Sequence, residues 1–239
     1  MKLHNSLIKN IIIPALLALT AWPLCSLAGG IRISPITVDI ASRDRASLIT
    51  LFNMSDDTSN LQVRVFKWTQ SNGNDNLTDT DDIIASPPFI TLPPGGSFNF
   101  RVVRTSDTKV NAEQSYRVII DELPKPQDKR SVGTGVGILI RNSLPLFVVN
   151  DSAIPKVQPS ISDSGLIMTN NGTRHALLSD VEITNLNTQK KLRLTVNTVN
   201  GYVLQNSYKN YPITRGFYIP GDKYQVTYKV NRQPEKNTL

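Results

Sequence analysis

The sequence predicts an all-β protein built from two β-sandwich domains, and three observations support this fold class. Apolar and polar residues alternate with a period of two in many short segments, as they do in half-buried strands. Clusters of glycine, proline and asparagine separate these segments, as turns do between antiparallel strands. No stretch has the period of a long amphipathic helix. Because each sheet must bury its apolar face, we expect the sheets to pack in pairs as sandwiches.

The predicted strands follow one another from Ile31 onward. The clearest segments are those in which valine, leucine, isoleucine or an aromatic residue alternates with a polar one: 47–52, 61–65, 98–101, 116–120, 137–149, 181–184, 191–196 and 224–230. Turn residues lie between them at 71–74, 93–96, 170–172 and 220–221. This spacing of strands and turns is typical of antiparallel sandwiches.

A segment with two prolines and little apolar content, 150–159, marks a boundary between domains. We expect the first domain over 29–150 and a smaller second domain over 151–239. The charge supports two different surfaces, because the chain has a net charge of +7 and the excess lies after residue 150. Residues 151–239 contain 11 basic and 6 acidic side chains, whereas the two kinds are balanced in 29–150.

Residues 1–28 have the features of a cleaved secretion signal. Two lysines precede an apolar run over 11–19, and Ser26 and Ala28 are the small residues that precede a cleavage site. The apolar run is far shorter than the roughly 20 residues that a membrane-spanning helix needs, so we expect no membrane insertion. Nucleic acid is not an expected partner of an exported chain.

The scarcity of reactive side chains excludes several kinds of site. Cys25, the single cysteine, lies inside the predicted signal, so the mature chain has no disulfide, zinc–cysteine site or thiol catalyst. His175 is the single histidine after residue 28, so neither a histidine cluster nor a Ser-His-Asp triad can be placed. Adjacent Asp121 and Glu122 point to opposite faces of a strand and cannot act as a carboxylate pair. We expect no enzyme activity, catalytic residue, metal or cofactor.

The segment 136–147 is the most informative part of the chain, because it carries large apolar residues on both alternating faces and follows a glycine-rich loop. We expect Leu139 and Phe147 to fill the core of the first domain. At a sheet edge the other face would be exposed and available to a partner. That face would carry Val136, Ile138, Ile140 and Leu144. The alternative is a central strand that is buried on both sides.

Five segments, in order, resemble the periplasmic chaperones of the chaperone/usher pathway, which assembles pili. They are 33–38, 62–68, 86–89 together with 92–95, 113–124 and 143–147. The resemblance covers most of the mature chain and implies two immunoglobulin-like domains set at an angle. It implies a pilus subunit as the partner, bound in the cleft and along the last strand of the first domain. Such a subunit lacks one strand of its own sandwich, and the chaperone lends an edge strand to it.

The anchor for the subunit is where this sequence departs from the family. Typical members hold the subunit's terminal carboxylate with an arginine in the first strand and a lysine near the end of the last strand. The matching positions are Thr37 and Pro145, so the basic pair is missing and the chain resembles the archaic branch. Arg117 is the first candidate for a replacement, since arginine can bind a carboxylate through two hydrogen bonds, and Arg101 is the second. The alternative for Arg117 is an outward-facing residue with a surface partner.

The resemblance also implies a polar contact between the domains through Glu122. The second domain matches the family less closely, and nine residues follow the predicted strand 224–230, so the final strand of relatives is either shortened or missing. The sequence therefore predicts a periplasmic chaperone that binds pilus subunits and passes them to an outer-membrane usher. Self-association of the free form is left open.

The alternative function is a two-domain adhesin or pilus structural subunit with the same fold. Such a subunit would need a long apolar extension before its first strand, and the predicted mature chain has only 29–32 there.

Overall fold

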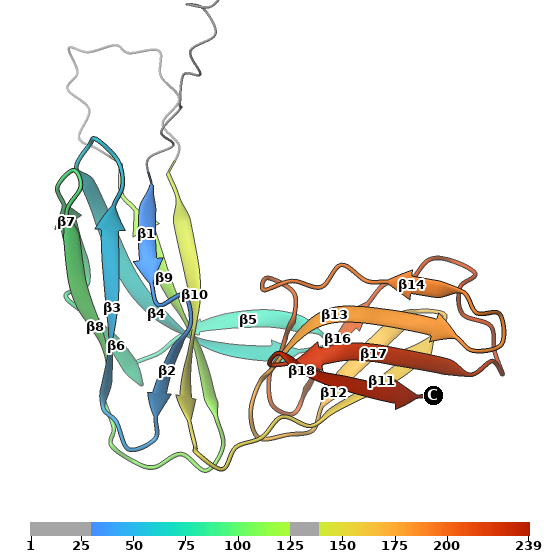
Figure 1. The fold of residues 1–239 in the computed structure, drawn as a ribbon. Helices are drawn as coiled ribbons and strands as arrows, with labels where there is room; N and C mark the ends of the chain where they lie inside the picture. The colour runs from blue at the N-terminus through green and yellow to red at the C-terminus, as the bar shows by residue number, and fades with distance from the viewer. Residues whose placement is uncertain (1–29, 125–138) are drawn as a thin grey trace, which may run out of the picture.

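The computed structural model describes residues 30–124 and 139–239, and these residues form strands and connecting segments without an α-helix. Two β-sandwiches are set at an angle, so that the molecule has the shape of an L (Figure 1). The predicted fold class is confirmed. Within these two ranges, no helix has the length and apolar character needed to cross a membrane.

The first sandwich consists of two sheets that enclose one core. The first sheet has the order β1 (Ile31–Ser34), β3 (Ala46–Asn53), β8 (Ser97–Arg104) and β6 (Ile83–Ser86). The second sheet has the order β2 (Val38–Ala41), β10 (Arg141–Val149), β9 (Gln114–Glu122), β4 (Ser59–Ser71) and β5 (Asn74–Asp79), with β7 (Phe89–Leu92) also paired to β4. Alternate residues such as Leu51, Phe100 and Ile120 fill the space between them.

The second sandwich has its own core, which includes Met168, Ile183 and Val226. One sheet contains β11 (Val157–Ser162), β12 (Gly165–Asn170) and β16 (Ser207–Tyr211). The other contains β14 (Lys191–Arg193), β13 (Ala176–Asn185), β17 (Tyr224–Val230) and β18 (Gln233–Thr238), with β15 (Tyr202–Val203) paired to β13. The final strand, β18, is therefore present and pairs along β17.

An aromatic cluster joins the two sandwiches. The rings of Phe147 and His175 stack with their centroids 3.7 Å apart, and Trp68 meets Tyr202 edge to face at 5.5 Å. Phe147 is fully buried in this cluster. The expectation that Phe147 fills the core of the first domain is wrong, because strand alternation places it on the other face of the sheet, which the second domain covers.

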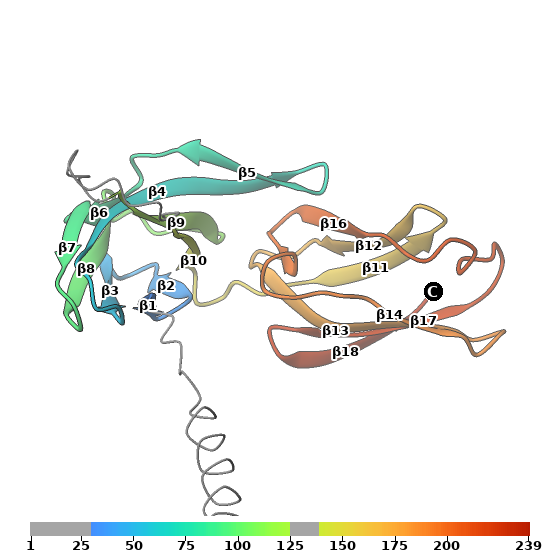
Figure 2. The ribbon, with the colours of Figure 1, turned by 90° about the horizontal axis from the view of Figure 1, so that it is seen from above.

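A long hairpin, formed by β4 and β5, extends from the first sandwich to the second (Figures 1 and 2). At its tip Asp75 forms an ion pair with Lys209 of β16 at 3.0 Å. The side chain of Gln70 donates to the carbonyl of Tyr202 at 2.9 Å and accepts from the N–H of Leu204 at 2.8 Å. The hairpin therefore makes a second contact between the domains.

Candidate functional site: an interdomain cleft with an unpaired arginine

A cleft of about 650 Å³ lies between the two sandwiches. Segments of the first domain (β1, the loop 36–37, β5, β9 and β10) and the loop 198–199 of the second domain line it. Its volume is typical of binding pockets, which measure roughly 300–1,000 Å³. The cleft brings together four positions that the sequence analysis selected, namely Thr37, Arg117, Leu144 and Pro145.

Arg117 of β9 presents a positive charge to this cleft. Its guanidinium lies over the ring of Trp68 at 3.7 Å and 5.6 Å from the ring of Tyr202. Burial lowers the pKa of Arg117, an effect that the nearby negative charge of Asp75 opposes. Arginine nevertheless stays charged at neutral pH, because its ordinary pKa lies far above 7.

The guanidinium of Arg117 has no hydrogen bond and no ion pair with any other residue in the described part of the chain. The acidic side chain that shares the cleft, Asp75, is already occupied: it pairs with Lys209 and accepts a hydrogen bond from Gln70 at 2.7 Å. Arg117 is therefore available to an anion, and its planar group suits a carboxylate.

Pro145 occupies the position at which typical family members carry a lysine, and it is buried. In the antiparallel register of β9 and β10, Pro145 lies directly opposite Arg117. A positively charged side chain thus lies one strand away from Pro145, in the same cleft.

Half of β10 has an unpaired edge. One edge pairs with β9 from Arg141 to Val148, but β2 pairs with the other edge only over Leu146–Val149. Among the described residues, no strand covers that second edge over 141–145. Unpaired backbone N–H and C=O groups of this kind can accept another strand.

The residues predicted to contact a subunit lie in different environments. Val136 and Ile138 lie outside the described residues. Ile140 is 46% exposed, and its carbonyl accepts a hydrogen bond from the N–H of Glu122, so the pairing with β9 reaches it. Ile140 and Leu144 therefore share one face of the strand.

Leu144, however, is only 5% exposed and packs in the core of the first domain. Its placement on a partner-facing surface is wrong, because the opposite sheet covers this face at Leu144 and leaves it exposed at Ile140. Leu139, expected in the core, is 54% exposed on the other face.

Arg101 does not lie in the cleft. It is exposed on β8, between the buried residues Phe100 and Val102, and so faces outward from the first sheet. The structure separates the two arginine candidates and brings only Arg117 to the interdomain cleft.

The predicted interdomain contact at Glu122 is wrong. Glu122 accepts a hydrogen bond from Ser59 at 3.4 Å within the first domain, because it lies at the end of β9 that points away from the second domain. Glu113, directly before β9, makes the contact instead. Its buried carboxylate accepts a hydrogen bond from the backbone N–H of His175 at 3.0 Å and lies 2.8 Å from the Nδ1 of His175.

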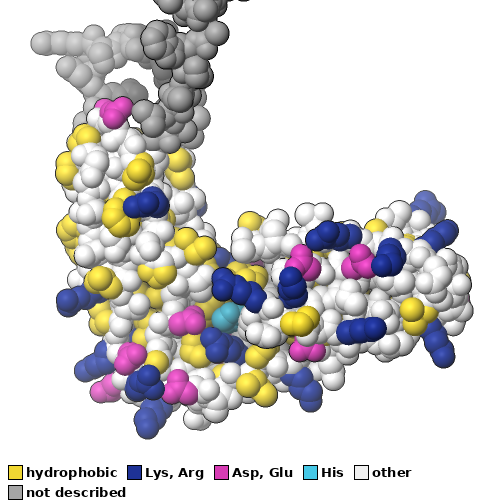
Figure 3. Space-filling model, in the orientation of Figure 1, with side chains coloured by type: hydrophobic (Ala, Val, Ile, Leu, Met, Phe, Trp, Pro, Cys, Tyr) yellow, Lys and Arg dark blue, Asp and Glu magenta, His cyan; other side chains and the backbone are white. Residues whose placement is uncertain are grey.

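The junction around Glu113 also contains a more exposed ion pair, between Arg174 and Asp39 at 3.3 Å. Acidic, basic and histidine side chains gather there (Figure 3). The sequence pattern does not predict this cluster. His175, the single histidine after residue 28, was the one signal in the sequence for this cluster, since its partner Glu113 lies in the other domain.

Asp121 of β9 links the start of β10 to β9 and β4 through hydrogen bonds. Its carboxylate accepts hydrogen bonds from Arg141 of β10 and, at 2.7 Å, from Arg64 of β4. Burial raises the pKa of Asp121, but the two guanidinium groups together have the larger effect and hold this pKa below its ordinary value.

Since the folded-state pKa of Asp121 is lowered, its contribution to stability is present above about pH 4 and is lost as the pH falls below that value. We expect Asp121→Asn to lower the free energy of unfolding by up to about 1 kcal/mol at neutral pH and to have almost no effect in strong acid. Urea unfolding at both pH values checks this, with Asp163→Asn, in the exposed turn after β11, as the control. A loss of equal size at both pH values would contradict the assignment.

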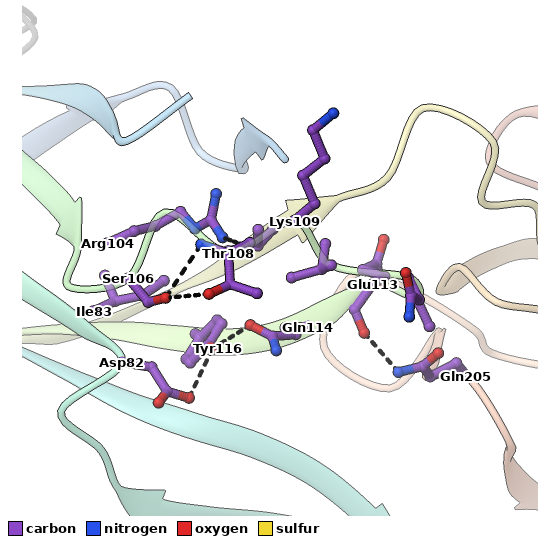
Figure 4. Close-up of a pocket in the computed structure, with 14 residues that line it drawn as sticks. Asp82, Ile83, Arg104, Ser106, Thr108, Lys109, Glu113, Gln114, Tyr116 and Gln205 are labelled. Carbon is purple, nitrogen blue, oxygen red and sulfur yellow. Dashed lines mark hydrogen bonds between the residues drawn. The ribbon is translucent and has the colours of Figure 1, made fainter. Parts of the chain in front are cut away.

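A second pocket, of about 410 Å³, lies beside β8 and β9 of the first domain and is also lined by Gln205 of the second domain (Figure 4). Its buried cation, Arg104, donates to the carbonyls of Ser42, Asp44 and Thr108. The hydroxyl of Tyr116 donates to Asp82 at 2.9 Å, and burial together with this hydrogen bond raises the pKa of Tyr116. Because these groups already have partners, this pocket is a weaker candidate site.

In the described ranges, no group of histidine, cysteine and acidic side chains is placed to hold a metal ion.

Within the described residues, two angled sandwiches, a strand edge without a partner strand and an arginine without an ion pair come together, an arrangement that suits an extended partner strand. Residues 30–152 match the family described as pili and flagellar-assembly chaperone, PapD N-terminal domain. This match spans more than half of the chain, and the chain belongs to this family. It is a chaperone of pilus assembly, which confirms the resemblance found in the sequence and argues against the adhesin alternative.

Solved structures of similar fold include other pilus chaperones. A chain of the CsuC-CsuE chaperone–tip adhesion subunit complex, from the archaic chaperone-usher Csu pili of Acinetobacter baumannii, is 23% identical with a TM-score of 0.63, covering 87% of this chain and 97% of that chain. The E. coli chaperone DraB is 16% identical with a TM-score of 0.61, covering 88% and 96%.

A chain of the Salmonella enterica SafA pilin–SafB chaperone complex is 14% identical with a TM-score of 0.62, covering 88% of this chain and 96% of that chain. At these identities the likeness shows a shared fold. No curated protein matches this chain.

Proposed function

We propose that this chaperone binds a pilus subunit by adding the open edge of β10, with the segment before it, to the subunit's incomplete sandwich. Arg117 holds the subunit's terminal carboxylate in the interdomain cleft. The observation that carries this proposal is that the unpaired edge over 141–145 ends in the same cleft as the unpaired guanidinium. The CsuC-CsuE and SafA–SafB complexes, each of a chaperone with a subunit, support this kind of partner.

The side chains proposed to enter the subunit's groove are Val136, Ile138 and Ile140. Ile140 lies on the same face of the strand as Leu144, but Ile140 is exposed whereas Leu144 is buried. Val136 and Ile138 continue the same period of two in the sequence. Backbone pairing supplies affinity for many subunits, and the alternate side chains supply selectivity. Each buried side chain contributes about 1.5–3 kcal/mol before the cost of ordering is subtracted.

We further propose that the chain acts in the periplasm after removal of residues 1–28, and that it passes subunits to an outer-membrane usher. It acts by binding alone, without catalysis or a cofactor. A strand from another subunit would replace the lent strand during assembly, because both use the same groove. Self-association of the free chaperone would use the same open edge.

The test is co-expression in the periplasm with the pilus subunits encoded nearby. Ile140→Asp is expected to fold normally, because the side chain is exposed, and to reduce the recovered complex at least about tenfold, because a charge would enter an apolar groove. Ile138→Asp is expected to act in the same way. Leu139→Asp is the matched control: it is equally exposed on the opposite face and is expected to keep the complex. Equal loss with both variants, or full recovery with Ile140→Asp, would contradict the proposal.

A further inference from the structure

We propose that the interdomain cleft recognises the side chain of the partner's last residue and selects an apolar one. This inference rests on the proposed binding of the partner's terminal carboxylate by Arg117. Three large apolar side chains line the cleft and are exposed: Ile36 by 74%, Leu77 by 46% and Val199 by 77%. These three side chains, which we call the apolar rim, line the same cleft as the guanidinium of Arg117.

The three side chains of this apolar rim come from separate parts of the chain. Ile36 lies between β1 and β2, Leu77 lies on β5, and Val199 lies in the loop before β15 of the second domain. Single exposed apolar side chains are common on protein surfaces, but a group of them in one concave site is typical of a binding surface.

The geometry of a terminal residue connects the rim to Arg117. The terminal carboxylate and the last side chain are attached to the same Cα, so a carboxylate held by Arg117 brings that side chain to the walls of the cleft. Leu77 lies directly opposite Trp68 in the register of β4 and β5, and Trp68 carries the guanidinium of Arg117 on its ring. Leu77, one of the rim residues, is therefore separated from the guanidinium of Arg117 by the side chain of Trp68.

The charges of the cleft favour a partner whose terminal residue has a free carboxylate and an apolar side chain. Asp75 forms an ion pair with Lys209 and accepts a hydrogen bond from Gln70. The exposed guanidinium of Arg32 lies over the ring of Phe52, 4.4 Å from its centroid. Arg117 is left as the half-buried cation of the cleft that has neither a hydrogen bond nor an ion pair among the described residues. A single carboxylate satisfies it, and the surface around it gains most from apolar contact.

Two of the three rim side chains, Leu77 and Val199, lie on segments that are held by contacts within the free protein. The hairpin that carries Leu77 is fixed to the second domain by the ion pair of Asp75 and Lys209. The loop that carries Val199 is closed by its own hydrogen bonds, in which the N–H of Val199 donates to the side chain of Asn197 at 2.8 Å. A preformed site loses little ordering entropy on binding, so the rim can discriminate between side chains.

The experiment measures the binding of short peptides to the mature chaperone through the fluorescence of Trp68, the single tryptophan after residue 28. The peptides are acetylated, alternate threonine with valine, and end in leucine, in glycine, or in leucine with an amidated terminus. We expect the leucine acid to bind at least about tenfold more tightly than the glycine acid, because it buries a whole side chain. The amide is expected to bind weakly.

Two variants separate the rim from the anchor. Leu77→Ser combined with Val199→Ser is expected to remove the preference for leucine over glycine and to leave the preference for acid over amide. Ile84→Ser changes an exposed isoleucine outside the cleft and is the matched control. Equal binding of the leucine and glycine acids to the wild type would overturn this inference alone. Equal binding of acid and amide, or no binding of any peptide, would overturn the carboxylate proposal on which it rests.

Discussion

Leu144→Asp is expected to prevent the first domain from folding. Leu144 packs with Leu146 and Val148 in the core between the two sheets, where a carboxylate has no partner. An unpaired buried charge costs several kcal/mol, which is comparable with the whole stability of about 5–15 kcal/mol that a domain has. Circular dichroism and urea unfolding of the purified variant measure the loss.

The control at this position is Leu144→Met, which keeps the side chain apolar and of similar volume and is expected to cost less than about 1.5 kcal/mol. The comparison with Ile140→Asp is equally informative, since both side chains share one face of the strand and only Leu144 is covered. A Leu144→Asp variant with the urea midpoint of the wild type would show that the core lies on the other face of β10.

Glu113→Ala is expected to lower the free energy of unfolding by about 3 kcal/mol and to loosen the junction between the domains. The buried carboxylate accepts the backbone N–H of His175 and contacts its ring nitrogen, so its removal leaves two buried polar groups without their partner. The unfolding transition should also become broader, because the two sandwiches would unfold less cooperatively.

Asp39→Ala is the matched control for Glu113→Ala. Asp39 also pairs across the junction, with Arg174, but both side chains are partly exposed and such a pair contributes about 0–1 kcal/mol. Urea unfolding compares the two variants. If Asp39→Ala proved as damaging as Glu113→Ala, burial of the carboxylate would not be the cause of its importance.

The fold class could be predicted from the sequence because period two and turn residues act locally. The same local rule identified Ile140 and Leu144 as residues on one face of a strand. It could not show where the opposite sheet stops covering that face, since this depends on how the two sheets pack on each other in the folded domain. Leu144 was therefore placed on the surface, although it belongs to the core.

The interdomain contacts could not be predicted from the sequence for a related reason. Glu113 and Glu122 lie at opposite ends of the same segment, and alternation does not tell which end meets the second domain. The reach of the β4–β5 hairpin, which brings Asp75 to Lys209, is likewise a property of the assembled domains. Arg117 could be proposed from the sequence because the resemblance to the family places Thr37 and Pro145 at the positions where typical members carry a basic pair.

Co-purification from periplasm is the direct test of whether Arg117 anchors the subunit in the cleft. The wild type, Arg117→Ala and Arg101→Ala are each co-expressed with the subunits encoded nearby. Arg101→Ala is the matched control, because it removes an exposed arginine that lies outside the cleft. We expect a stoichiometric complex with the wild type and with Arg101→Ala, and a loss of at least about tenfold with Arg117→Ala. A complex that survives Arg117→Ala undiminished would contradict this role of Arg117.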